Sequence, residues 1–217
     1  MGDGAETPPA SPAGRATSKA TRAVLLGPPG SGKGTQGTIL AAQLGVPAIS
    51  TGDMLREAVK AGSELGLKVN GIMQAGLLVD DGTMAEVIRE RLSRSNGEGF
   101  LLDGYPRTIP QAETLERILG EAGDGLDAVL SVEVPEEELV RRAVARKRGE
   151  DDREEVVRER LKVYREKTAP LIGYYRGLGL LREIDGYRPV AEVTAQMLAA
   201  LGLSATSAGP AGSAGQS

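Results

Sequence analysis

Short, almost continuous apolar runs alternate along the chain with longer stretches in which apolar residues recur at helical spacing. Strands that are apolar throughout are typical of a parallel sheet covered by helices on both faces. The pattern therefore predicts an α/β fold built on a doubly wound sheet of five parallel strands. The expected strands are residues 23–26, 46–50, 100–103, 128–134 and 180–185.

The carboxyl ends of these strands are where a ligand site is expected. In open parallel sheets, ligands bind in the crevice outside those ends. The residues that directly follow Leu26, Ile49, Leu102 and Val134 are therefore the first candidates.

Polar residues near these points carry the signals of helix starts. Either Thr51 or Asp53 is a candidate N-cap, and Thr108 followed by Pro110 is another. Farther along, Asp152 and Glu155 have the spacing of a capping box.

The two ends of the chain differ in composition from the rest. Residues 1–20 and 204–217 are rich in Ala, Pro, Ser, Gly and Thr, which is typical of disordered tails. Residues 21–203 are left as one folded domain, long enough for a substantial core. The first residues lack the features of a signal peptide, and Asp3 and Glu6 argue against a transit peptide, so a cytoplasmic location is expected.

Composition excludes several kinds of chemistry. The chain has no His, no Cys and no Trp. Ser-His-Asp and Cys-His triads, disulfides and imidazole acid–base catalysis are therefore excluded, and no structural zinc is expected. The net charge of −4 argues against a general binder of nucleic acids or anionic membranes. Catalysis must rest on carboxylates, Lys, Arg, hydroxyls, backbone dipoles or a metal held by oxygen.

A glycine-rich segment follows the first expected strand. Residues 27–35 read Gly-Pro-Pro-Gly-Ser-Gly-Lys-Gly-Thr, which is Gly-x4-Gly-Lys before a helix that begins near Lys33. Glycines expose backbone N–H groups, the helix adds its positive end, and the lysine supplies a charge for a β- or γ-phosphate. The strict motif has Ser or Thr directly after Lys, whereas Gly34 intervenes here before Thr35. We expect a phosphate-binding loop for a nucleoside triphosphate; the alternative is a Gly/Pro turn that contains a lysine.

An acidic and a basic residue follow the third expected strand. Asp103 stands where a P-loop enzyme needs a carboxylate for Mg²⁺ or its waters, although it could also cap the turn at Gly104. Arg107 carries a guanidinium that can clamp a phosphate through two hydrogen bonds. We expect Mg²⁺ to arrive with the nucleoside triphosphate and to be held by Asp103 through water.

Further arginines are placed at helical spacing. In the Arg-rich stretch 141–148, Arg142 and Arg146 are four residues apart on one helix face and could join Arg107 around a triphosphate. A solvated basic face is the alternative, and it is favoured for Arg141 and Lys147. A charge at Arg160 lies within an apolar stripe, so it either snorkels to solvent or reaches a cleft. The stripe consists of Val157, Leu161 and Tyr164.

Several spaced motifs, in one order, make the sequence resemble adenylate kinase. The motifs are the phosphate loop at residues 27–35, Ser-Thr-Gly-Asp-Met-Leu-Arg at 50–56, Asp-Gly-Tyr-Pro-Arg-Thr at 103–108 and Thr-Ala-Pro-Leu-Ile at 168–172. The similarity covers about residues 22–202. It implies a sheet of the P-loop NTPase type, an AMP-binding region at 50–79 and a short lid at 145–151.

The resemblance also implies roles for individual residues. Catalytic roles fall to Lys33, Arg107, Arg146 and Arg160. ATP binding is implied for Gly30, Ser31, Gly32, Lys33, Gly34, Thr35, Arg142, Arg146 and Arg188. AMP binding is implied for Thr51, Arg56, Leu77, Leu78, Val79, Gly104, Tyr105, Pro106, Arg107, Gln111, Arg148 and Arg160. Without the resemblance, Leu77, Leu78 and Val79 would be assigned to core packing, and Arg56 and Gln111 to ordinary polar positions on helices.

The lid departs from the family pattern. The family usually places an Arg two residues before an Asp-Asp pair, but Gly149 stands there before Asp151, and Arg148 is three residues before it. The segment from Arg146 to Asp151 is very short and has none of the metal-binding cysteines of some long-lid relatives. We expect Arg148 to supply the missing charge from a shifted position.

Phosphoryl transfer suits a chain without His or Cys, because it needs aligned substrates and charge neutralisation more than covalent help. The resemblance implies the reaction ATP + AMP = 2 ADP in a monomer whose partners are ATP, AMP and ADP, with no nucleic acid and no membrane. Alternatives are a kinase for UMP or CMP, a non-catalytic nucleotide-binding module, and a nucleic-acid-binding protein that uses residues 141–148.

Overall fold

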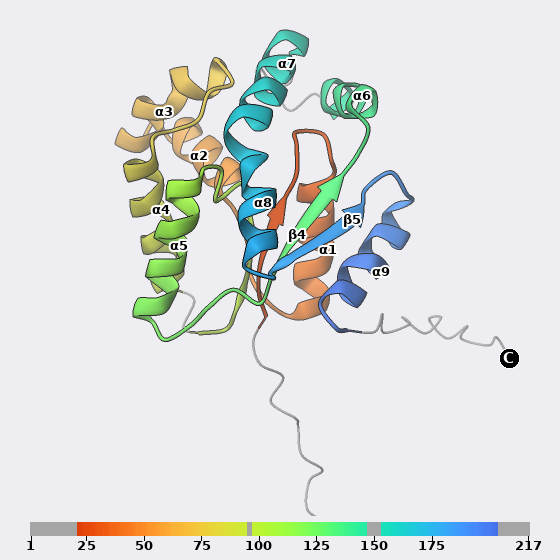
Figure 1. The fold of residues 1–217 in the computed structure, drawn as a ribbon. Helices are drawn as coiled ribbons and strands as arrows, with labels where there is room; N and C mark the ends of the chain where they lie inside the picture. Colours follow the sequence, from red (N-terminus) through yellow and green to blue (C-terminus); the bar gives the residue numbers. More distant parts are fainter. Residues whose placement is uncertain (1–20, 95–96, 147–152, 204–217) are drawn as a thin grey trace, which may run out of the picture.

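The computed structural model describes residues 21–94, 97–146 and 153–203. Its sheet contains β1 (Arg22–Leu26), β2 (Ala48–Ser50), β3 (Phe100–Asp103), β4 (Ala128–Glu133) and β5 (Leu181–Asp185). All neighbours are parallel, and the strand order is β2-β3-β1-β4-β5. The predicted five-stranded parallel sheet is confirmed (Figure 1), with strand bounds that differ from the expected ones by at most two residues.

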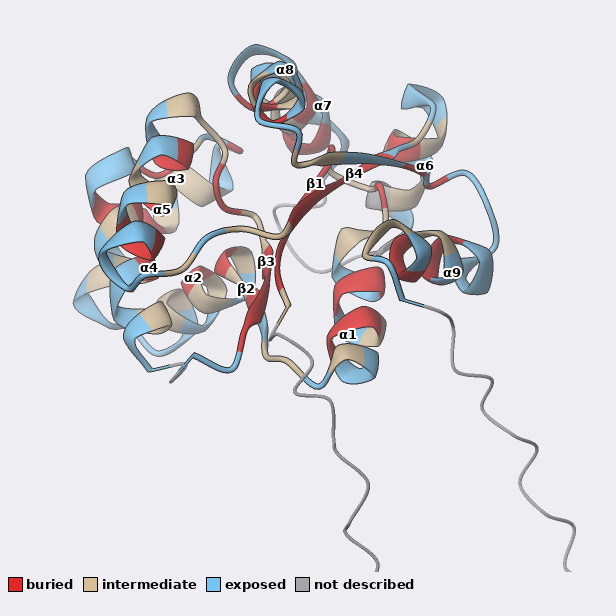
Figure 2. Cartoon of the chain, turned by 60° about the horizontal axis from the view of Figure 1, so that its bottom comes forward, coloured by how far each residue is buried: buried red, intermediate tan, exposed pale blue. Residues whose placement is uncertain are grey.

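Helices cover both faces of the sheet, which confirms the doubly wound arrangement (Figure 2). One face packs against α1 (Lys33–Leu44) and α9 (Val190–Ala200). The opposite face packs against α4 (Asp81–Ser93), α5 (Ile109–Glu121) and α8 (Pro170–Gly177).

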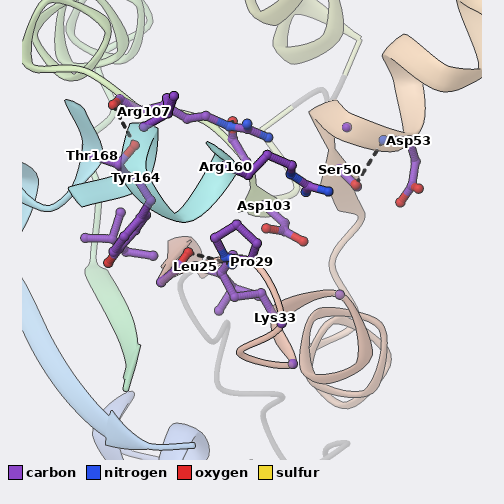
Figure 3. A pocket seen from close by; sticks show the side chains of 18 of the residues that line it. Leu25, Pro29, Lys33, Ser50, Asp53, Asp103, Arg107, Arg160, Tyr164 and Thr168 are labelled. Atoms are coloured by element: carbon purple, nitrogen blue, oxygen red, sulfur yellow. Dashed lines mark hydrogen bonds between the residues drawn. The ribbon is translucent and has the colours of Figure 1, made fainter. Parts of the chain in front are cut away.

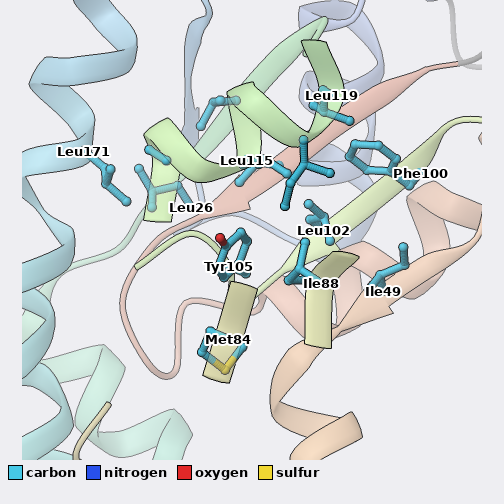
Figure 4. Packing of buried hydrophobic residues seen from close by; sticks show 14 of the residues in the cluster. Leu26, Ile49, Met84, Ile88, Phe100, Leu102, Tyr105, Leu115, Leu119 and Leu171 are labelled. Atoms are coloured by element: carbon cyan, nitrogen blue, oxygen red, sulfur yellow. The ribbon is translucent and has the colours of Figure 1, made fainter. Parts of the chain in front are cut away.

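Alternation along β1 divides the core into two clusters. Val24 and Leu26 point into the larger cluster, whereas Ala23 and Leu25 point into the cluster under α1 and α9. This follows from the two-residue period of a strand, and it explains why β1 is apolar at every one of these positions. Figure 4 shows the larger cluster, in which Phe100 and Tyr105 add aromatic rings to an otherwise mostly aliphatic core.

Two further groups of helices stand near the carboxyl ends of the strands (Figure 1). The first is α2 (Thr51–Lys60) with α3 (Glu64–Gln74), which approach so closely that a Cβ on Gly66 would lie 2.1 Å from the Ala58 carbonyl oxygen. The second is α6 (Glu136–Arg146) with α7 (Glu154–Val163), joined through a small apolar cluster that includes Leu139 and Val157. A π-helical turn, η2 (Tyr164–Thr168), continues α7 into α8.

The observed helix starts agree only in part with those predicted from the sequence. Thr108 caps α5 as predicted, accepting a hydrogen bond from the Gln111 amide at 3.3 Å. Neither Thr51 nor Asp53 caps α2, because Ser50 occupies that position and accepts from the Asp53 amide. The helix α7 begins at Glu154, with Arg153 as N-cap and no side-chain cap bond, and Asp152 of the predicted capping box lies outside the described residues.

Several predictions concern residues outside those described. They are the two tails at 1–20 and 204–217, Asp152, Arg148 and most of the lid, and those predictions stay open. Among the described residues, the helices are too short or too polar to cross a membrane.

Candidate active site

The phosphate loop joins β1 to α1 and depends on glycine for its path. Gly30 and Gly32 have φ of +84° and +93°, in the left-handed region that favours glycine. A Cβ on Gly30 would lie only 2.3 Å from the Leu139 carbonyl oxygen, so α6 packs directly against the loop. The predicted helix start at Lys33 is confirmed, and the first turn of α1 carries no acidic residue that would oppose an anion.

Lys33 is tied to the loop that precedes it. Its Nζ donates hydrogen bonds to the Gly27 and Pro28 carbonyl oxygens at 2.6 and 2.8 Å and to Ser31 Oγ at 3.3 Å. Ser31 is itself buried. These bonds hold the ammonium group at the wall of the cleft, close to the backbone that would surround a phosphate (Figure 3).

A cleft of about 360 Å³ opens at the carboxyl ends of the strands, a size that suits a small ligand. Its walls come from the segments after β1, β2 and β3, as expected from the ends of those strands. The segment directly after β4 does not line it; α6 contributes Arg142 instead. Residues with predicted roles that line this cleft are Gly30, Gly32, Lys33, Gly34, Thr35, Arg56, Leu78, Asp103, Gly104, Pro106, Arg107, Arg142 and Arg160.

The topology explains why the cleft opens here. β1 leads into α1 on one face of the sheet, whereas its neighbour β3 leads into α5 on the other face. The loops that follow these two strands diverge, and such a switch point leaves a crevice between them. The phosphate loop and Asp103 therefore face the same space.

Arg107 is held through both its side chain and its backbone. Its Nε donates to the Gly104 carbonyl oxygen at 2.8 Å, and its own carbonyl oxygen accepts from Thr168 Oγ1 at 2.9 Å (Figure 3). Burial lowers the pKa of the guanidinium, Asp103 opposes that change, and the nearby charge of Arg56 adds to it. Two cations that face each other in this way are stabilised by an anion placed between them.

The other arginines converge from three different helices. Arg56 of α2 pairs with Asp53 at 2.7 Å. Arg142 of α6 donates to Glu138 and, at 3.1 Å, to the Gly186 carbonyl oxygen. Hydrogen bonds from Arg141 and Arg142 lower the pKa of Glu138 to about 2, so this carboxylate stays ionised and holds Arg142 in place.

The position of Arg160 decides between the two alternatives for a charge within an apolar stripe, which are snorkelling to solvent and reaching a cleft. Val157 and Leu161 of α7 are buried, while Arg160 lines the cleft rather than leaving toward bulk solvent. Gly76 makes this possible, because a Cβ there would lie 3.1 Å from the Cγ of Arg160. Figure 3 shows Arg160 and Arg107 in the same part of the cleft as Asp103.

A second pocket adjoins the cleft and shares Arg56, Arg107 and Arg160 with it. Of the residues with predicted acceptor roles, it also contains Thr51, Leu77, Leu78, Val79, Gly104 and Gln111. Thr51 is buried and donates to the Asp103 carbonyl oxygen at 3.3 Å. Assigning Leu77 to core packing is wrong, since it is 51% exposed, whereas Val79 belongs to the core.

Some predicted site residues lie elsewhere. Tyr105 is buried in the core and donates to the Gln111 carbonyl oxygen at 3.1 Å, so its side chain lines neither pocket. Arg188 pairs with Asp185 at 2.8 Å and is likewise absent from both linings. Arg141 is exposed, as predicted, and it pairs with Glu138. Lys147, Arg148 and the side chain of Arg146 lie outside the described part of the chain.

Among the residues in or next to the site, Tyr164, Thr168 and Asp81 were missed or misjudged by sequence reasoning. Tyr164, assigned to the apolar stripe, lines the cleft. Thr168 lines it too and holds the Arg107 backbone; its only signal was its place in a family motif. Asp81 accepts from Gln111 Nε2 at 2.8 Å, and no local pattern distinguishes it from an ordinary first-turn acid.

The residues present fit a Mg²⁺ ion that arrives with a nucleotide. Asp103 and Thr35 bring a carboxylate and a hydroxyl to the same cleft as the phosphate loop. In the described ranges, no cluster of three or more acidic residues could hold a metal by itself. Mg²⁺ commonly keeps several waters and uses one or two carboxylates together with substrate phosphates, which is the donor set offered here.

Comparison with known proteins gives a consistent result. The family model described as adenylate kinase matches residues 25–180. An adenylate kinase of Thermus thermophilus is 52% identical over 183 residues, covering 83% of this chain and 96% of the relative. Those of Thermobifida fusca and Syntrophotalea carbinolica are 49% and 45% identical, covering 83% and 82% of this chain and 97% of each relative. This chain belongs to the adenylate kinase family.

Proposed function

We propose that this chain transfers a phosphoryl group from MgATP to AMP, giving two molecules of ADP, and that the cleft described above is the active site. The observation that carries the assignment is the position of Arg56, Arg107 and Arg160, which line both the cleft and the adjoining pocket. Positive charge at the junction of two nucleotide subsites is what transfer between two phosphates requires.

The donor nucleotide occupies the cleft. The backbone N–H groups of the phosphate loop and the Nζ of Lys33 bind its phosphates, and Thr35 and Asp103 would hold the Mg²⁺ that accompanies ATP. Bound Mg²⁺ neutralises part of the phosphate charge. The resemblance assigns Arg142 to the adenine end of the donor, and its hydrogen bonds to Glu138 and to the Gly186 carbonyl oxygen would hold it there.

The acceptor occupies the adjoining pocket. Arg56 exchanges Asp53 for the AMP phosphate, while Arg107 binds the phosphate that is being transferred. Thr51, Gln111 and residues 77–79 surround the base. Residues 50–79 are thus the acceptor region, as the resemblance implies.

The remaining arginines close over the transferring group. Arg146, Arg148 and Arg160 come from α6, the short lid at 145–151 and α7. Closure excludes water, which would otherwise hydrolyse ATP.

A coupled assay for ADP tests the activity. The wild-type chain, given MgATP with AMP, UMP, CMP or GMP, is expected to turn over AMP at the highest kcat/KM. Preference for UMP or CMP would contradict the assignment of the acceptor, and nucleotide binding without turnover with any acceptor would contradict enzymatic activity.

Lys33→Met tests the assignment of the cleft. Methionine keeps the length of the side chain but not its charge, so we expect kcat to fall by about 100-fold or more with an unchanged folded structure. Lys60→Met, at an exposed position outside both pockets, is the matched control. Near wild-type turnover in Lys33→Met would show that the phosphate loop does not act in catalysis.

A further inference from the structure

The side-chain amide of Gln111 is held from two sides by groups of opposite hydrogen-bonding character. Asp81 Oδ1 accepts a hydrogen bond from Gln111 Nε2 at 2.8 Å. On the other side, the Arg107 backbone N–H donates to Gln111 Oε1 at 2.7 Å. Gln111 is 2% exposed, and it lines the pocket assigned to the acceptor.

These two contacts determine which way round the amide sits. An ionised carboxylate can only accept, and a backbone N–H can only donate. Turning the amide by 180° would place oxygen against the Asp81 carboxylate and an NH₂ group against the Arg107 N–H. Both contacts would then be repulsive, so the orientation of the amide is fixed.

Asp81 is itself held in position by the start of α5. Thr108 Oγ1 donates to Asp81 Oδ1 at 3.1 Å, and the same hydroxyl accepts from the Gln111 backbone N–H. Asp81 also lies in the first turn of α4, where the helix dipole favours a negative charge. The carboxylate therefore joins the starts of α4 and α5 next to the acceptor pocket.

A primary amide has two N–H donors and two lone pairs. With one of each used by Asp81 and Arg107, one donor and one acceptor remain, in a fixed order. Adenine presents N1 as an acceptor and its 6-amino group as a donor, whereas a 6-oxo purine presents N1–H as a donor and O6 as an acceptor. A fixed amide matches only one of these edges, while a rotating amide matches both.

From these contacts we infer that Asp81 is a positioning residue that fixes the amide of Gln111 and thereby sets the preference for 6-amino over 6-oxo purine monophosphates. The inference rests on the proposed function, since it assumes that the pocket of Gln111 receives the acceptor base. Asp81 acts through Gln111 and need not touch the substrate.

AMP and IMP form the test pair, because their bases differ at position 6 and at the N1 proton. The measured quantity is the ratio of kcat/KM for AMP to kcat/KM for IMP, with MgATP as donor. Asp81→Ala is expected to lower this ratio by about tenfold or more, the equivalent of one charge-assisted hydrogen bond. The change should appear in the KM for AMP, with kcat and the KM for MgATP within about twofold of wild type. Asp81→Asn, which keeps an oxygen acceptor, should retain part of the ratio.

Asp80→Ala is the matched control. Asp80 is the neighbouring acid and is exposed like Asp81, and it caps α4 by accepting from the Thr83 amide at 2.8 Å without contacting Gln111. Its substitution should weaken the start of α4 and lower the melting temperature, but leave the AMP-to-IMP ratio unchanged. A ratio that falls equally in Asp80→Ala and Asp81→Ala would reduce Asp81 to a structural role and overturn the inference.

The Gln111→Ala background tests whether Asp81 acts through the amide. Adding Asp81→Ala there should change neither the ratio nor the KM for AMP, because the group being positioned is already gone. An effect of the same size in both backgrounds, or an unchanged ratio in the single variant, would overturn the inference while leaving AMP kinase activity in place. A wild-type chain that fails to phosphorylate AMP would overturn the proposed function and, with it, this inference.

Discussion

The chemistry of the site depends on how individual cations are restrained. Arg107 is fixed through its side chain by Gly104 and through its backbone by Thr168 and Gln111. Arg56, in contrast, pairs with the exposed carboxylate of Asp53, and a surface ion pair of this kind is weak enough to exchange for a substrate phosphate. A rigid guanidinium suits a transition state, because its position need not be adjusted as charge moves. A releasable one suits the binding of a substrate that comes and goes.

Arg107→Ala is therefore expected to impair the rate more than the affinity for MgATP. We expect kcat to fall by about 100- to 1000-fold, the magnitude typical of losing one preorganised charge donor, with the KM for MgATP changed only severalfold. Arg117→Ala, on the exposed face of α5, is the matched control. Steady-state kinetics separate the two parameters, and an unchanged kcat would show that Arg107 does not clamp the phosphate that is being transferred.

Residue type and spacing indicated which side chains to examine, but not how each is held. Lys33, Asp103 and Arg107 could be selected because each follows an apolar strand, and strand ends meet at one edge of the sheet. The contacts of Asp81 and Thr168 could not be foreseen. They join residues 30 and 61 positions apart, and only the packing of α4, α5 and η2 brings them together.

At the scale of elements, the phosphate loop is shaped by what packs against it. Gly30 and Gly32 both have left-handed φ, but their surroundings differ. A Cβ on Gly30 would collide with the backbone of α6, whereas a Cβ on Gly32 would meet no atom within 4 Å. The sequence alone shows two equivalent glycines, and the difference arises from the position of a helix more than 100 residues away.

The two glycines make a matched pair of substitutions. Gly32→Ala is expected to cost roughly 1–2 kcal/mol of unfolding free energy, the strain of a left-handed backbone. Gly30→Ala should cost a further ~1–3 kcal/mol, because neither the loop nor α6 can move away cheaply. Urea unfolding of both variants gives the two free energies, and equal values would show that the contact with α6 does not constrain the loop.

Over the whole molecule, the arrangement of strands and covering helices was predictable, and the ends of elements were not. Apolar runs predicted the strands, because in a sheet buried on both faces nearly every strand position is occupied by an apolar side chain. Helix caps depend on single hydrogen bonds of about 1 kcal/mol, which neighbours such as Ser50 and Thr51 can exchange at little cost. Most of the lid lies outside the described residues, so the expected role of Arg148 stays a prediction.

The composition also determines how the stability of the whole fold responds to pH. Since the chain has no His and no Cys, we expect a nearly constant unfolding free energy between about pH 6 and 9. Above that range the buried tyrosines titrate. Burial, with a smaller effect of Asp81, raises the pKa of Tyr105 to about 12, and burial with Glu133 raises that of Tyr164 to about 12. Burial raises the pKa of Tyr175 as well.

Between pH 10 and 12 a tyrosine in the unfolded chain loses its proton, while the same residue in the folded chain keeps it. The unfolding free energy must therefore fall as pH rises through this window, by about 2–3 kcal/mol for Tyr105.

Tyr105→Phe and Tyr175→Phe make a matched pair. The hydroxyl of Tyr105 donates to Gln111, whereas that of Tyr175 is buried and has no hydrogen-bonding partner among the described residues. At pH 7, Tyr105→Phe should cost about 1 kcal/mol and Tyr175→Phe should be neutral or stabilising. In both variants the unfolding free energy, measured by urea titrations from pH 7 to 12, should fall less steeply with pH than in the wild type. A fall as steep as that of the wild type would show that neither tyrosine causes it.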